Sequence, residues 1–111
     1  MDSLEEKRQI IENIFRDYAQ ISYRYGDLKN QVIINRDSDS YLLMTVGWSN
    51  QKRVHYCLLH IDIIDGKIWI QRDGTEDGIA IELVMAGIPK DQIVLAFHPA
   101  EIRQHTEFAV T

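Results

Sequence analysis

The sequence predicts an α+β fold in which an N-terminal helix and a second helix cover one face of a mainly antiparallel sheet of about four to five strands. Apolar side chains recur at helical spacing near the N-terminus and again after residue 75, and between these segments they alternate with polar ones. Asp65 and Gly66 add one of the strongest short-range signals for a β-hairpin. We expect one domain, residues 1–111, because a chain of this length builds a single core.

The composition is that of a folded, acidic protein. Hydrophobic residues make up 45% of the chain, which is enough for a core, and the net charge of −5 gives an average surface field that disfavours direct DNA binding. A single cysteine, Cys57, cannot close an internal disulfide, and no apolar run approaches the length of a membrane-spanning helix. Because the N-terminus is charged and lacks a secretory signal, we expect a cytoplasmic protein without a membrane segment.

The first helix is expected from Ser3 to about Gln20. Ser3 and Glu6 have the spacing of a capping box, in which each side chain caps the other's backbone amide. The segment is amphipathic, and the apolar positions on its one face are Leu4, Ile11, Ile14, Phe15 and Tyr18.

Two strands are predicted after this helix. Turn-forming residues occupy 23–30, and the β-branched run that follows predicts a strand over 31–35. A polar turn at 36–40 leads to a second strand over 41–48, in which even-numbered residues face one way and odd-numbered residues the other. The even-numbered set is Leu42, Met44, Val46 and Trp48.

The third and fourth strands are expected to form hairpins with their neighbours. The polar tetrad 49–52 has the length of a hairpin connection and precedes the longest strand, 53–64. Asp65 and Gly66 then turn the chain into a strand over 67–72, which places strands two to four in meander order. On the third strand, Cys57 alternates with Leu59 and is expected to face the core.

A second helix is predicted from Thr75 to Ala86, with Thr75 as its N-cap and Gly87 as its C-cap. After it, residues 92–97 are expected to form a fifth strand or an extended segment, and residues 99–104 a helical turn.

His60 and Asp62 are the first candidates for chemistry. Strand alternation places both on one sheet face, with the spacing of two metal ligands or of an acid and a base. Solvent exposure or a role in an interface explains the same spacing, and we favour that interpretation. His98, Glu101 and His105 would share a helical face, but no metal-binding motif accompanies them. We expect no metal and no cofactor.

Basic and aromatic side chains supply a second candidate surface. Lys52, Arg53 and Arg72 could form a small basic patch across the third and fourth strands, although such charges more often protect sheet edges from aggregation. Trp48 and Trp69 could anchor a partner or complete the core. The candidate partner-contact residues are Trp48, Arg53, His60, Asp62, Trp69 and Arg72.

A series of motifs follows in order along the chain: Val46-Gly47-Trp48, Leu59 to Ile63, Asp65 to Gln71, Asp73 to Glu76, Gly87 to Lys90 and Phe97 to Pro99. Together they resemble the XisI family, whose members are known as fdxN-element excision controlling factors. The likeness covers nearly the whole chain and implies a single XisI-like domain.

The resemblance implies a cyanobacterial regulatory protein that helps a site-specific recombinase to excise a DNA element during heterocyst development. It implies a non-enzymatic accessory factor that acts through an XisH-type companion with a restriction-endonuclease fold, and it supplies no catalytic residue.

Two alternatives come from the residues themselves. One is a direct DNA-binding module that uses Lys52, Arg53 and Arg72, and the other is a small metal-dependent hydrolase or nuclease that uses His60 and Asp62. A homodimer is also expected, because long hairpins leave sheet edges or faces to cover.

Overall fold

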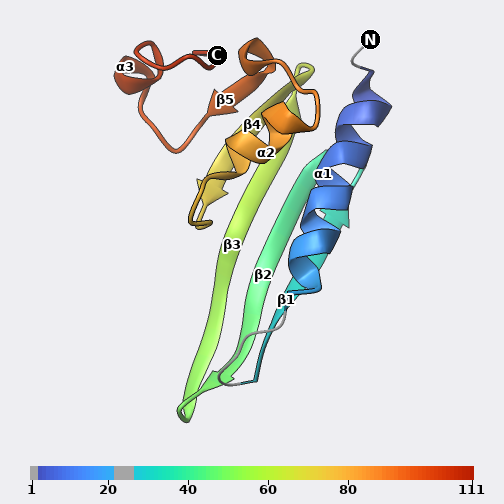
Figure 1. Cartoon of the computed structure of the whole chain (residues 1–111), viewed down its shortest axis with the longest axis vertical. Helices are drawn as coiled ribbons and strands as arrows, with labels where there is room; N and C mark the ends of the chain where they lie inside the picture. The colour runs from blue at the N-terminus through green and yellow to red at the C-terminus, as the bar shows by residue number, and fades with distance from the viewer. Residues whose placement is uncertain (1–2, 22–26) are drawn as a thin grey trace.

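The structure, a computed structural model, describes residues 3–21 and 27–111 and confirms the α+β fold (Figure 1). Helices α1 and α2 lie on the same face of a five-stranded sheet, and the molecule is elongated, measuring 44 × 30 × 24 Å. The elements in chain order are α1 (Leu4–Ala19), β1 (Asp27–Asn35), β2 (Ser40–Ser49), β3 (Lys52–Ile64), β4 (Lys67–Asp73), α2 (Ile79–Met85), a 3₁₀ turn η1 (Lys90–Gln92), β5 (Ile93–Leu95) and α3 (Ala100–Arg103).

The sheet has the strand order β1-β2-β3-β4-β5. Strands β2, β3 and β4 form the predicted meander, β1 extends it as an antiparallel neighbour of β2, and β5 returns through α2 to pair with β4 in parallel. Strand β1 begins at Asp27 rather than at residue 31, because residues 27–30 continue the ladder with β2 as far as Trp48. The turn predicted over 23–30 is therefore wrong for 27–30, and its first part, 23–26, lies outside the described residues.

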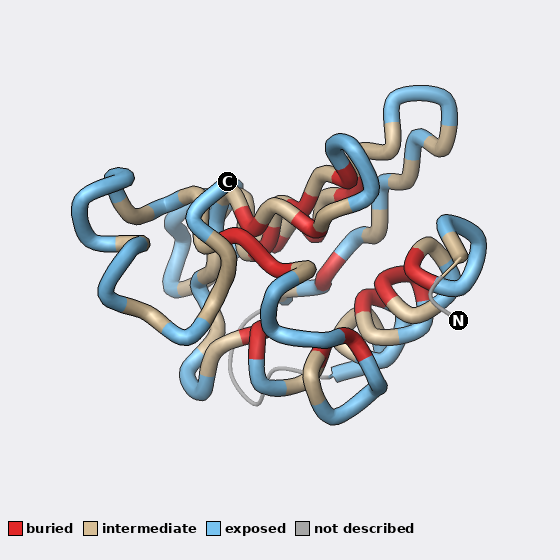
Figure 2. Tube along the Cα trace, turned by 90° about the horizontal axis from the view of Figure 1, so that it is seen from above, coloured by how far each residue is buried: buried red, intermediate tan, exposed pale blue. Residues whose placement is uncertain are grey.

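The core lies between the two helices and the sheet face that they cover. Figure 2 shows the buried stretches gathered where helices and strands meet, with the connecting loops exposed. The α1 helix contributes Ile11 and Phe15, and its predicted cap is confirmed because the Ser3 side chain accepts a hydrogen bond from the Glu6 amide. The fully buried sheet and α2 residues include Tyr41, Leu43, Leu59, Ile61, Ile68, Ile70, Ile79 and Leu83.

Helix α2 starts at Ile79, not at Thr75. Asp73 organises the segment before it: one carboxylate oxygen accepts from the amide and hydroxyl of Thr75, and the other accepts from the Ile79 amide at 2.8 Å. Gly78 has φ 91°, which interrupts any helix that would begin earlier. The C-cap residue is Ala86 rather than the predicted Gly87. Gly87 follows it with φ 110°, and the amides of Gly87 and Ile88 close a Schellman motif with the carbonyls of Val84 and Leu83.

A β-bulge in β3 reverses the expected orientation of Cys57. Leu43 pairs with Leu59, but the next residue, Met44, pairs with Cys57, so Leu58 is the extra residue. Paired residues share a sheet face, and Cys57 therefore lies on the Met44 face instead of in the core with Leu59. Burial raises the pKa of the Cys57 thiol, which disfavours the thiolate needed for nucleophilic chemistry.

Ion pairs attach α1 to the turn between β1 and β2. Arg8 donates from Nε to Asp39 Oδ1 at 2.7 Å and from Nη2 to Asp39 Oδ2 at 3.1 Å. Arg36 Nε lies 2.7 Å from the Glu12 Oε2 atom, and the Glu12 side chain is almost fully buried. The bidentate contact of Arg8 with Asp39 and the largely buried contact of Arg36 with Glu12 thus fix the position of α1 on the sheet.

The C-terminal segment covers the outer edge of β5. Ala109 bridges to Val94, and its amide donates to the Ile93 carbonyl at 2.9 Å. The predicted helical turn at 99–104 is present as α3, whereas β5 is shorter than the extended segment expected over 92–97. Within the described ranges, none of the helices has the length and apolar character required to cross a membrane.

Candidate functional site

The sheet face opposite α1 and α2, which we call the open face, is not covered by either helix (Figure 1). Strand pairing places its side chains in rows across β1, β2 and β3. One row joins Trp48 to Arg53, and the next joins Lys29, Val46 and His55. Trp48 lies at the end of the open face where β2 turns into β3, and 52% of it remains exposed. This end of the open face therefore presents a large aromatic side chain to solvent.

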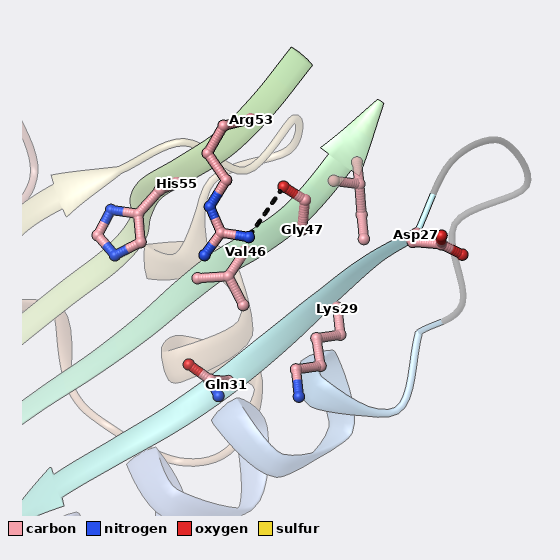
Figure 3. Close-up of a pocket in the computed structure, with 8 residues that line it drawn as sticks. Asp27, Lys29, Gln31, Val46, Gly47, Arg53 and His55 are labelled. Atoms are coloured by element: carbon pink, nitrogen blue, oxygen red, sulfur yellow. Dashed lines mark hydrogen bonds between the residues drawn. The ribbon is translucent and has the colours of Figure 1, made fainter. Parts of the chain in front are cut away.

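These rows enclose a hollow of about 650 Å³, which we call the β1–β3 hollow. Figure 3 shows Arg53 and His55 from β3 and Lys29 and Gln31 from β1 around Val46, which is almost completely buried. Its remaining lining residues are Asp27, Leu28 and Gly47. The hollow therefore has an apolar floor and cationic walls.

Arg53 is held in place at the rim of the hollow by two contacts. Its guanidinium carbon lies 5.5 Å from the centroid of the Trp48 ring, and its Nη1 donates to the Gly47 carbonyl at 3.4 Å (Figure 3). Gly47 has φ 145°, and a β-carbon there would lie 1.8 Å from the Asp27 carbonyl oxygen. Only glycine allows β1 to approach β2 this closely, so the shape of the hollow depends on it.

Lys29 and His55 are available to a ligand. In the part of the chain that the structure describes, neither side chain makes a hydrogen bond or an ion pair, and both residues are exposed. Both were missed from the sequence. The position of His55 follows from the predicted hairpin connection 49–52. That connection pairs its flanking residues Trp48 and Arg53, and two residues further along each strand it pairs Val46 with His55.

His60 and Asp62 come together as the strand alternation predicts. His60 Nε2 lies 3.1 Å from Asp62 Oδ1, and Gln71 donates to Asp62 Oδ2 at 3.3 Å. The described residues contain no group of three or more His, Cys, Asp or Glu side chains that could hold a metal, and this includes His98, Glu101 and His105. His60 and Asp62 are thus hydrogen-bonded to each other in the middle of the open face.

The structure does not bring Lys52, Arg53 and Arg72 into one basic patch. Lys52 begins β3 and pairs with Ser49 at the hairpin end, outside the hollow. Arg72 pairs with His60 and donates to the Cys57 carbonyl at 3.3 Å. Cys57 is four residues from Arg53 along β3, which corresponds to roughly 13 Å of strand between the backbone positions. The cation that accompanies Arg53 is Lys29 instead.

The two tryptophans have different environments. Trp69 pairs with the buried Val94 and lies beneath Arg103, whose guanidinium carbon is 5.8 Å from the ring centroid. Arg103 also donates to the carbonyls of His98 and Val110, so Trp69 supports the C-terminal segment of its own chain. Trp48 has no such cover and is exposed, so it can contact another molecule.

A separate apolar surface lies on the outer side of α2. A hollow of about 270 Å³ there is lined by residues that include Ile81, Met85 and Phe108. Met85 is 82% exposed, the highest value among the large hydrophobic residues. This surface is on the helix side of the sheet and is distinct from the open face.

Comparison with known proteins gives consistent matches. The family model described as "XisI protein" matches residues 1–110. The chain is 34% identical to an XisI-like protein from Anabaena variabilis, whose crystal structure superposes with a TM-score of 0.87 over 98% of this chain and 100% of that one. It is 37% identical to the fdxN element excision controlling factor XisI of the same organism, with a TM-score of 0.81 over 97% and 98%. No curated protein matches the chain.

Proposed function

The chain belongs to the XisI family, and we propose that it is a non-enzymatic controlling factor for the excision of a DNA element, acting by contact with an XisH-type companion protein. One solved relative carries the name fdxN element excision controlling factor. The observation that carries the proposal is the exposed Trp48, fixed beside Arg53 on the sheet face that neither α1 nor α2 covers.

Trp48 and Arg53 have the properties of interface anchors. Tryptophan and arginine are the residue types that most often dominate binding energy, especially where a pocket adjoins them. Here the two side chains hold each other and border the β1–β3 hollow, so little conformational freedom is lost when a partner binds. A regulatory subunit needs this kind of surface more than it needs a catalytic centre.

The chemistry of the open face favours a binding role over catalysis. His60 and Asp62 form a hydrogen-bonded pair that lies among the strands, and neither residue lines the β1–β3 hollow or the hollow beside α2. The raised pKa of Cys57 keeps its thiol protonated at neutral pH, so the one cysteine is a poor nucleophile.

Direct DNA binding is the weaker candidate. The net charge is −5, and Lys52, Arg53 and Arg72 do not form the continuous basic stripe that follows a phosphate backbone. We therefore place the DNA contacts on the partner and the regulatory contact on this chain.

Co-purification tests this proposal. The chain and an XisH-type protein from the same genome are co-expressed with a tag on only one of them and then run on size exclusion with light scattering. We expect one peak with the summed mass at micromolar concentration. Separate elution, together with binding of the chain alone to duplex DNA in a salt-dependent gel shift, would contradict the proposal and favour the DNA-binding alternative.

A further inference from the structure

We propose that the β1–β3 hollow binds a carboxylate-bearing segment of a partner protein. This assignment rests on the proposed function, because it names the chemistry of the surface through which the companion is contacted. Lys29, Arg53 and His55 bring two permanent cations and one imidazole to a single cavity whose floor is Val46 (Figure 3). An acidic side chain would find several donors at once there.

Lys29 differs from most basic side chains in the described part of the chain, which already make a hydrogen bond or an ion pair. Among the described residues, Lys29 and Lys52 are the Lys and Arg side chains that make neither a hydrogen bond nor an ion pair. The engaged side chains are Lys7, Arg8, Arg16, Arg36, Arg53, Lys67, Arg72, Lys90 and Arg103. Lys29 therefore offers a full ammonium group to a ligand.

Arg53 retains most of its donor capacity. Its Nη1 donates to the Gly47 carbonyl at the long distance of 3.4 Å, and the remaining N–H groups of the guanidinium make no hydrogen bond to the described residues. A guanidinium binds a carboxylate through two parallel hydrogen bonds. Because the Trp48 ring orients this group, its free edge is presented in a fixed direction.

Size and charge favour a peptide over a nucleic acid. A volume of about 650 Å³ accommodates one or two side chains, and Asp27 at the rim would repel a phosphate dianion more than a single carboxylate. The nearly buried Val46 and the exposed Trp48 offer apolar contact to the carbon chain of a glutamate or to its neighbours. A polyanionic duplex would meet only two cations here and the field of an acidic protein elsewhere.

A peptide titration tests the site directly. The probe is a fluorescein-labelled peptide of alternating glutamate and valine, measured by fluorescence polarisation at low salt. We expect Lys29→Gln and Arg53→Gln each to weaken binding about fivefold, the effect of one partly exposed charge pair. Lys52→Gln is the matched control, because Lys52 adjoins Arg53 in sequence but lies outside the hollow, and it should bind as the parent does. A lysine-valine peptide should not bind.

Three outcomes would overturn the assignment: no polarisation change up to millimolar peptide, equal binding by the Lys29→Gln and parent proteins, or tighter binding of duplex DNA that the same variants abolish. The same variants are then assayed for co-elution with the XisH-type protein. If the companion co-elutes equally with all variants, the hollow assignment fails and the proposed function stands. If the peptide binds as expected and the companion never co-elutes, the proposed function fails and the anion site stands.

Discussion

The indole ring of Trp48 and the guanidinium of Arg53 face each other across the β2–β3 hairpin, 5.5 Å apart. At an exposed site such a contact contributes about 0.5–1 kcal/mol, which is small for folding. Its larger effect is that it restricts two side chains that would otherwise sample many rotamers. The hairpin thus presents an ordered aromatic and cationic pair in an area where α1 and α2 give no cover.

Removal of Trp48 should affect binding more than folding. We expect Trp48→Ala to weaken the complex with the XisH-type companion by about 2 kcal/mol or more, the usual effect of a hot-spot tryptophan. The free energy of unfolding should change by less than about 1 kcal/mol, because half of the side chain is already in water. Met85→Ala, an exposed position on the helix side, is the control for calorimetric titration and should leave binding unchanged. Equal affinities for the two variants would contradict this prediction.

Gly47 should be one of the least replaceable residues of the chain. Gly47→Ala forces a β-carbon against the Asp27 carbonyl and requires φ 145° from an L-residue, so we expect a loss of about 2–4 kcal/mol in the free energy of unfolding. Gly66→Ala is the matched control: φ is 79° there, but the space around the new carbon is open. It should cost about 1 kcal/mol. Urea denaturation monitored by tryptophan fluorescence measures the free energy of unfolding of both variants. Similar losses for Gly47→Ala and Gly66→Ala would show that the close approach of β1 to β2 does not cause the destabilisation.

Asp73 rather than Thr75 should set the stability of the α2 start. Asp73→Ala removes the acceptors for Thr75 and for the Ile79 amide, and we expect it to lower the free energy of unfolding by about 1–2 kcal/mol. Thr75→Ala removes the hydroxyl donor to Asp73 but leaves the Ile79 amide bonded, and it should cost less. A larger effect for Thr75→Ala in chemical denaturation would instead support a helix capped at residue 75.

The contact between Arg8 and Asp39 should make part of the stability depend on acid pH. The two hydrogen bonds from Arg8 hold the pKa of Asp39 below its usual value, against the opposing effect of burial. The folded state therefore favours the carboxylate, and this stabilisation is present above the unfolded pKa of about 4 and is lost as the pH falls through the lowered folded pKa.

Asp39→Asn should therefore be less stable than the parent at pH 7, and the difference should shrink at pH 3. Urea midpoints at the two pH values measure this. Asp37→Asn is the control, because in the described structure the Asp37 carboxylate makes no hydrogen bond or ion pair. A constant difference between Asp39→Asn and the parent across the pH range would mean that the carboxylate charge is not responsible.

Most of the fold follows from local signals in the sequence. Alternation in β2 and in β3 from Leu59 onward, the turn at Asp65 and Gly66, and the cap formed by Ser3 and Glu6 agree with the structure. Helix α2 was placed too early because residues 73–77 are all compatible with a helix start. The choice between them depends on the Asp73 carboxylate, which reaches forward to Ile79, a contact that no local propensity encodes.

The site was harder to predict because it depends on register. Lys29 lines the hollow since it pairs with Val46, which in turn requires Asn35 to pair with Ser40. The sequence placed the whole of 36–40 in the turn, and a shift of one residue moves a side chain to the opposite face. The bulge at Leu58 has the same effect on Cys57. No glycine or proline marks the start of β2 at Ser40 or the bulge at Leu58 in the sequence.

The pairing of Ala109 with Val94 has a consequence for self-assembly. It occupies the outer side of β5, whereas β1 pairs only with β2 among the described residues. Another strand can therefore add along β1, and also along the first part of β3, which extends beyond β4 and pairs only with β2. If two copies join through β1, each covers the β1 edge of the other, and only the shorter β3 segment stays open.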